Sequence, residues 1–182
     1  EKRYKKFLES ISNKKLDTKQ NKELDDFLST RFEGNNQVAI DDSYFKEINF
    51  PQILEKINFD PKKRNLFLFS NIYWDVGINE MSFLYKDVLT WVRETINLVS
   101  DSDSINLYIK THPGEYFDKS KTLKGVADFI REEFGKNLPK NVFLIEPFLK
   151  IKPYDLFPII DLEIVFSGTL GLEMMLKDIP VV

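Results

Sequence analysis

The sequence predicts an α/β fold with a doubly wound, mostly parallel sheet, preceded by a helical N-terminal segment. From residue 61 onwards, five apolar runs of strand length alternate with stretches of helical spacing. Such alternation is typical of a parallel sheet covered on both faces. Before residue 61 the apolar residues recur at helical spacing instead. We therefore expect a helical segment over residues 1–60 and a sheet domain over residues 61–182.

Composition indicates one folded domain with an appendage. The chain has 182 residues, of which 42% are hydrophobic and 30% charged, with 16 Phe that can fill a core. The net charge of -3 provides no positive field, so nucleic acid is not an expected partner. The absence of cysteine excludes a disulfide framework, a thiolate zinc site and a cysteine nucleophile.

The chain reads as a piece of a longer protein. It begins at Glu1 rather than at Met, and it ends in "IPVV", which is typical of the middle of a strand. We therefore expect further regions outside this chain.

Three helices are expected before the sheet. Apolar residues at i, i+3 and i+4 spacing predict two amphipathic helices, and a proline in the first turn favours a short third one. Gly34 and its neighbouring asparagines predict a loop after the second helix, and Asp60-Pro61 ends the third. The three helices are expected at residues 1–16, 19–32 and 51–57.

Strands and helices then alternate to the end of the chain. Apolar runs such as "NLFLFSN" are continuous rather than alternating, as expected of parallel strands that are buried on both faces. Strands are expected at residues 65–71, 105–111, 141–147, 162–167 and 180–182, and helices at residues 83–100, 122–135, 153–160 and 169–177. Ligands of an open parallel sheet bind where the carboxyl ends of its strands meet. That edge should gather four loops, at residues 71–82, 111–117, 146–154 and 167–171.

The stretch "FSGTLGLE" ends the fourth strand and begins a helix. Gly168 allows a close backbone turn, and Thr169 can cap the helix that follows. A phosphate there would accept backbone N–H bonds and meet the positive end of the helix dipole. Glu173 lies one turn after Thr169, so its carboxylate could accept hydrogen bonds from hydroxyls of the same ligand. The alternative is a helix start with glycine at a tight packing point.

His112, the only histidine, follows the second strand in "THPGE". It can donate a hydrogen bond to a phosphate oxygen, and with an ordinary pKa of about 6.5 a bound dianion would favour its charged form. Pro113 fixes the turn and restricts His112 to extended backbone. The alternative is a histidine in a surface loop. No metal site is expected, because a single histidine cannot hold zinc.

The loop "SNIYWDVGINE" follows the first strand. Trp74 or Tyr73 could stack on a base or sugar, and Asp75 could bind a hydroxyl or act as a base. Equally, Trp74 could cover the end of the core while Asp75 forms the turn. The residues alone leave both interpretations open.

Together, "LFLFSNIYWD", "INLYIKTHPGE" and "PYDLFPIIDLEIVFSGTLGLEMMLKDIPVV" resemble the donor-binding, Rossmann-like C-terminal half of GT-B glycosyltransferases. The likeness is to the capsule polysaccharide biosynthesis family, which includes bacterial Kdo transferases, and it covers residues 62–182. It implies transfer of a sugar from a nucleotide-activated donor, with CMP-Kdo or CMP-sialic acid favoured. The acceptor would be a glycan or glycolipid of a capsule or surface polysaccharide, and neither metal nor cofactor is implied.

The resemblance also implies roles for residues. The histidine of the family's His-Pro pair contacts the donor phosphate, and its strand-end element binds phosphate and donor hydroxyls. The catalytic candidates are His112 and Asp75, and the nucleotide-sugar-binding candidates are His112, Pro113, Ser167, Gly168, Thr169, Gly171, Glu173 and Trp74. Two positions depart from the pattern. Gly168 stands where a second hydroxyl residue is common, and Asp178 replaces the usual glycine before the last strand, where it can serve as an alternative helix cap.

In such enzymes the general base usually comes from the other half, so this chain alone is expected to bind nucleotide but to turn over poorly or not at all. A cytoplasmic location is implied, and regions outside this chain could attach the protein to the inner face of the membrane. Two alternatives stay open. One is an enzyme like the nucleotide-sugar 2-epimerases, and the other is a non-catalytic polysaccharide assembly or export component of the same fold.

Overall fold

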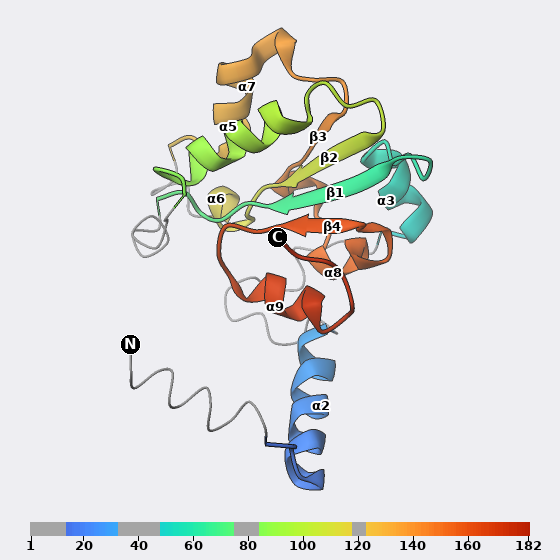
Figure 1. Ribbon diagram of the computed structural model, residues 1–182. Helices are drawn as coiled ribbons and strands as arrows, with labels where there is room; N and C mark the ends of the chain where they lie inside the picture. Colours follow the sequence, from blue (N-terminus) through green and yellow to red (C-terminus); the bar gives the residue numbers. More distant parts are fainter. Residues whose placement is uncertain (1–13, 33–47, 75–83, 118–122) are drawn as a thin grey trace. The chain divides into compact units, whose positions relative to one another are not determined.

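The structure is a computed structural model that describes residues 14–32, 48–74, 84–117 and 123–182 (Figure 1). By its contacts the chain divides into two units, Glu1–Tyr44 and Phe45–Val182. Most of the helix expected at residues 1–16 and the loop expected after Phe32 lie outside the described residues. Within the described part of the chain, no helix has the length and apolarity needed to cross a membrane.

In the first unit the structure describes α2 (Thr18–Phe32), which matches the helix expected at residues 19–32. Its start is closed by a reciprocal pair of hydrogen bonds. The Gln20 N–H donates to Asp17 Oδ1 at 2.8 Å, and the Asp17 N–H donates to Gln20 Oε1 at 3.0 Å. This capping box satisfies two backbone donors and explains why the helix begins at Thr18.

The second unit contains the predicted α/β fold with a four-stranded, all-parallel sheet (Figure 1). The strands are β1 (Arg64–Phe69), β2 (Ile105–Lys110), β3 (Val142–Ile145) and β4 (Leu162–Ile164), in the order β3-β2-β1-β4. The fifth expected strand is present as a parallel bridge between Val181 and Glu163 at the outer side of β4. β1 is therefore central, with β2 and β4 beside it.

Most predicted helices of this unit are present, with altered ends. They are α3 (Phe50–Lys56), α5 (Val88–Val99), α7 (Val126–Phe134), α8 (Pro153–Leu156) and α9 (Thr169–Met175). α5 begins later than predicted because Asp87 caps it, with the Thr90 N–H donating to Asp87 Oδ1 at 2.7 Å. A short helix that we did not predict, α6 (Gly114–Phe117), follows His112 directly.

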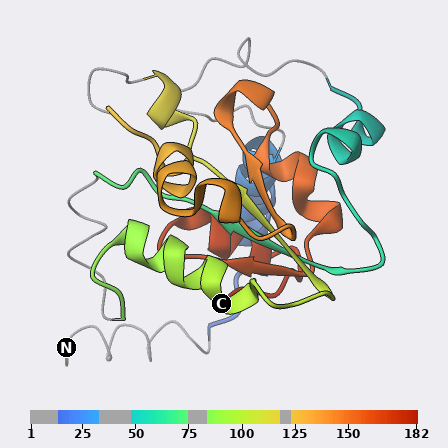
Figure 2. The ribbon, with the colours of Figure 1, turned by 90° about the horizontal axis from the view of Figure 1, so that it is seen from above.

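Alternate residues of each strand contribute to two separate core clusters. Phe67 and Tyr108 join the cluster that includes residues of α3, α8 and α9, whereas Leu68 and Leu107 join the cluster that includes residues of α5 and α7. Figures 1 and 2 show α5 and α7 side by side along the sheet. The strands are thus buried on both faces, which is why their sequences are continuously apolar.

α3 packs against the sheet. Ile53 and Ile57 are each only 2% exposed and belong to the same cluster as Phe67. Burial of two such side chains stabilises the domain by about 3 to 6 kcal/mol relative to their exposure. The sequence grouped this helix with residues 1–60, whereas its contacts place it in the unit Phe45–Val182.

The turn after α9 contains Asp178, where the resembled family has glycine. Asp178 has φ of 58°, the left-handed conformation that commonly ends a helix. The Asp178 N–H donates to the Met175 carbonyl at 3.1 Å, and the Ile179 N–H donates to the Met174 carbonyl at 3.0 Å. Asp178 thus takes the helix-ending role that we expected of it.

Candidate functional site

Hydrogen bonds tie together three strand ends at the carboxyl edge of the sheet. The His112 N–H donates to Ser70 Oγ at 3.2 Å, which links the end of β2 to the end of β1. On the other side of β1, Asn71 Nδ2 donates to the Ser167 carbonyl at 2.8 Å. The segment Ser70-Asn71 therefore lies between the His112 loop and the Ser167 turn. The structure brings both sequence-predicted loops to one edge.

His112 is half-buried, and its ring is oriented by its own loop. The Gly114 N–H donates to His112 Nδ1 at 3.0 Å, so in the neutral ring the proton resides on Nε2. Burial and the nearby Lys110 charge lower the pKa of His112 to about 4. In the ligand-free protein His112 is therefore a neutral hydrogen-bond donor at physiological pH. The expectation that a bound dianion would favour its charged form stays a prediction.

Lys110, the last residue of β2, is the most unusual group at this edge, and we did not select it from the sequence. It is 4% exposed, and its side chain makes no hydrogen bond or salt bridge with any described residue, whereas its backbone carbonyl accepts the Ser70 N–H at 2.9 Å. Burial lowers its pKa to about 8, although the Asp155 carboxylate acts in the opposite direction. The available signal was a lysine within a strand that was predicted to be buried on both faces.

The turn into α9 depends on glycine. Gly168 has φ of 137° and ψ of 168°, a region that is essentially restricted to glycine. It occupies the N-cap position without any side-chain cap, and α9 begins at Thr169. The prediction that Thr169 caps this helix is therefore wrong.

Gly171 is a packing glycine, which was the alternative interpretation of this stretch. A Cβ atom there would lie 3.4 Å from side-chain atoms of Val165 and Val181, and 3.5 Å from Glu163 Oε2. An alanine Cβ would fill this space at van der Waals contact, and a longer side chain would meet these same residues. Gly171 thus brings α9 close to β4 and the C-terminal segment.

Glu173 points inward from α9. It is 5% exposed, and the Tyr154 hydroxyl donates to its Oε2 at 2.8 Å. Tyr154 belongs to α8, so this hydrogen bond joins two helices on the same side of the sheet. Thr169, by contrast, is exposed. A ligand could therefore reach Thr169 freely but only the edge of the Glu173 carboxylate.

Two remaining candidates belong to the loop after β1. Trp74 is half-buried, and the described part of this loop ends with it. Asp75, the second catalytic candidate, lies outside the described residues.

Pro113, in the loop after β2, is half-buried beside His112 and precedes α6, as its fixed φ favours.

Glu115 is a further buried acid that sequence reasoning missed. Its carboxylate accepts the Val126 N–H, with distances of 3.1 and 3.3 Å to its two oxygens. Burial, with a contribution from the Asp128 charge, raises the pKa of Glu115 to about 7. The contact fastens α6 to the start of α7 and thereby fixes the loop that carries His112.

No family model, curated protein or solved structure matches the chain. The likeness to the donor-binding half of GT-B enzymes therefore stays a prediction from the sequence motifs. What the site can do follows from the residues themselves.

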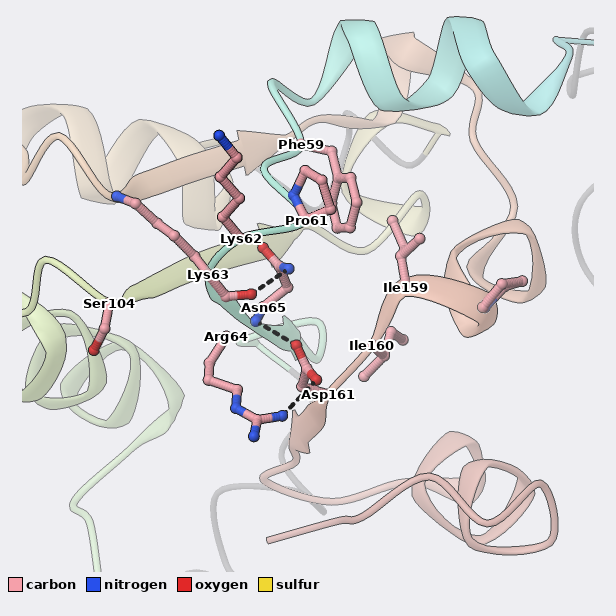
Figure 3. Close-up of a pocket in the computed structure, with 11 residues that line it drawn as sticks. Phe59, Pro61, Lys62, Lys63, Arg64, Asn65, Ser104, Ile159, Ile160 and Asp161 are labelled. Atoms are coloured by element: carbon pink, nitrogen blue, oxygen red, sulfur yellow. Dashed lines mark hydrogen bonds and ion pairs between the residues drawn. The ribbon is translucent and has the colours of Figure 1, made fainter.

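A pocket of about 710 Å³ lies at the opposite, amino-terminal edge of the sheet (Figure 3). Its lining includes Lys62, Lys63 and Arg64, and the Arg64 guanidinium pairs with the Asp161 carboxylate at 3.2 Å. Figure 3 shows the two lysine side chains extending away from the apolar wall at residues 159–160. Because these cations do not converge, the pocket is a weaker candidate for anion binding than the carboxyl edge.

Proposed function

We propose that the chain is the donor-binding domain of a metal-independent GT-B glycosyltransferase with a doubly wound, Rossmann-like fold. In this proposal the carboxyl edge of the sheet holds the phosphate of a nucleotide-activated sugar. One observation supports it above all: Lys110 is buried there without a salt bridge to any described residue, beside the neutral donor His112.

Burial of the Lys110 ammonium group is costly, the Asp155 carboxylate offsets only part of that cost, and a bound anion would offset more of it. The decrease in the pKa of Lys110 from 10.5 to about 8 corresponds to about 3 kcal/mol of lost stability for its charged form. A phosphate beside Lys110 would supply the missing negative charge, and His112 Nε2–H would donate to a second oxygen. The two groups thus form the positive and the neutral part of an anion site.

The turn at Gly168 would bind the other side of the same ligand. The hydrogen bonds through Ser70 and Asn71 hold this turn and the His112 loop on either side of the β1 end. Gly168 would let the backbone of this turn approach the ligand closely. Glu173, which is 5% exposed, would accept a ligand hydroxyl.

In sugar transfer, negative charge develops on the phosphate as the sugar leaves. Lys110 and His112 would stabilise that charge by electrostatic interaction and hydrogen bonding, without nucleophilic attack. A base must also take the proton of the acceptor hydroxyl, and Asp75 is our candidate within the chain. The chain alone is expected to bind the donor and to catalyse transfer poorly or not at all.

The substrate proposal follows the sequence motifs. It names a CMP-Kdo or CMP-sialic acid type donor and a glycan or glycolipid acceptor in capsule or surface polysaccharide biosynthesis. Such work would take place in the cytoplasm at the inner face of the membrane.

Nucleotide binding tests the proposal. Thermal unfolding of the wild-type chain would be followed with CMP, UDP, GDP and their sugars. A nucleotide at about 100 times its Kd should stabilise the domain by about 2.7 kcal/mol. Lys110→Met should bind that nucleotide about 10- to 100-fold more weakly, the range expected for loss of a charged hydrogen bond. The control is Lys140→Met, an exposed lysine outside the site.

Each other outcome selects an alternative. Stabilisation by UDP compounds alone would favour an epimerase-like enzyme. No stabilisation by any nucleotide would contradict donor binding and favour a non-catalytic polysaccharide assembly or export component of the same fold. Equal binding by wild type and Lys110→Met would place the nucleotide elsewhere.

A further inference from the structure

A second buried carboxyl group lies close to Glu173. Glu163, in the middle of β4, is 0% exposed, and neither of its side-chain oxygens has a hydrogen-bond partner among the described residues. A charged residue in such a position is rare unless it is paired. An unsatisfied polar group in a core requires an explanation, because it costs free energy that an apolar residue would not.

Glu163 lies against the helix that carries Glu173. Its Oε2 lies 3.5 Å from where a Cβ atom of Gly171 would be, so the carboxyl group contacts α9, the helix that carries Glu173. Its strand neighbours, Phe67 on β1 and Val181 in the C-terminal segment, carry no charge. The charge that acts on Glu163 among the described residues is that of Glu173.

The two acids have different partners. Glu173 accepts the Tyr154 hydroxyl, whereas neither side-chain oxygen of Glu163 has a hydrogen-bond donor among the described residues. Burial and the Glu173 charge raise the pKa of Glu163 to about 7. Ionisation of Glu163 near this pH therefore places a negative charge against α9, the helix that carries Glu173.

We propose that Glu163 is a positioning residue for the contact between a ligand hydroxyl and the Glu173 carboxylate, which Tyr154 holds. While Glu163 is neutral, this contact can form. When Glu163 ionises, the contact becomes weaker. The inference rests on the proposed function for the identity of the ligand. A second negative charge beside Glu173 repels its carboxylate and also opposes an anionic ligand at the same edge. Ligand affinity should therefore fall as the pH rises through about 7.

The proposed coupling can be measured without any ligand. In the full chain with ¹³C-labelled glutamate carboxyl groups, the Glu173 signal should move as the pH passes through about 7. In Glu163→Gln, which keeps the shape and removes the charge, this step should be absent. If the Glu173 signal shows the same step in both proteins, or no step in either, the coupling is refuted. Glu163→Leu is the second variant if the amide does not fold.

The positioning role needs a ligand as well. CMP affinity would be measured by calorimetry at pH 6.0 and 8.5. Lys110 also loses charge over this range, in both proteins, so the comparison between wild type and Glu163→Gln isolates Glu163. We expect the wild-type affinity to fall about tenfold more than that of Glu163→Gln. Equal falls would overturn the positioning role. If CMP binds neither the wild type nor Glu163→Gln at any pH, CMP is not the ligand, and Glu163 has no positioning role in CMP binding. The NMR signal of Glu173 would then still decide whether Glu163 and Glu173 are coupled.

Discussion

Replacement of Lys110 by methionine should make the domain more stable while it removes a binding group. The unfolded chain takes up the lysine proton near pH 10.5, and the folded chain only near pH 8. Stability is therefore lost as the pH falls from about 10.5 to 8, and the full cost of about 3 kcal/mol is present below pH 8. Methionine has a similar length and no charge, so Lys110→Met should gain up to that amount at pH 7. The gain should vanish near pH 10.5.

Urea unfolding of Lys110→Met and wild type, followed by circular dichroism from pH 7 to 10.5, measures this difference. Lys140→Met, an exposed lysine, is the matched control and should show no gain of this size. A variant that is less stable than wild type at pH 7 would show that Lys110 has a partner in the folded chain. A gain that does not depend on pH would mean that packing rather than charge is responsible. Combined with weaker nucleotide binding, a pH-dependent gain would identify a group kept for function at the expense of stability.

Three further predictions concern single residues. Gly168→Ala should destabilise the domain by about 1 to 3 kcal/mol in urea unfolding, because alanine is strained at φ of 137°, and an unchanged midpoint would contradict the described turn. Asp178→Gly should raise stability by about 1 kcal/mol, since glycine adopts the left-handed conformation without steric cost, and a loss would point to a role of the aspartate side chain. The His112 ring should stay neutral with its proton on Nε2 down to about pH 5 in ¹⁵N NMR spectra, and a midpoint near 6.5 would contradict its burial. Because the unfolded chain binds this proton first, the His112 contribution to stability is lost as the pH falls from about 6.5 to 4.

The sheet could be predicted from the sequence because its strands are buried on both faces. Continuous apolar runs marked β1 to β4, and the rule that ligands bind at the carboxyl ends of parallel strands pointed to the loops that contain His112 and Gly168. The prediction failed where local capping decides an element. α5 starts at Val88 because Asp87 caps it, and α6 forms from residues that we expected to be a simple turn.

The buried charges were missed for a different reason. Lys110 and Glu163 lie within strands. The apolar residues around them predicted those strands, and the single charged residue in each strand was not considered as a site candidate. A charged side chain at the centre of a doubly covered sheet is costly, so its presence is itself a signal of chemistry. Glu115 gave no such signal, since its role as an acceptor for the start of α7 depends on a contact between segments that the sequence does not reveal.

The central position of β1 has a consequence for synthesis of the chain. β1 is made early, yet its partner on one side, β4, follows about 96 residues later, as the Asn65 and Asp161 pairing shows. At a translation rate of about 5 to 20 residues per second, one edge of β1 waits about 5 to 20 seconds for its neighbour. During that time the apolar run "NLFLF" presents unpaired backbone groups that could pair with other nascent chains. Slower translation or higher expression should therefore increase aggregation before it affects the finished fold.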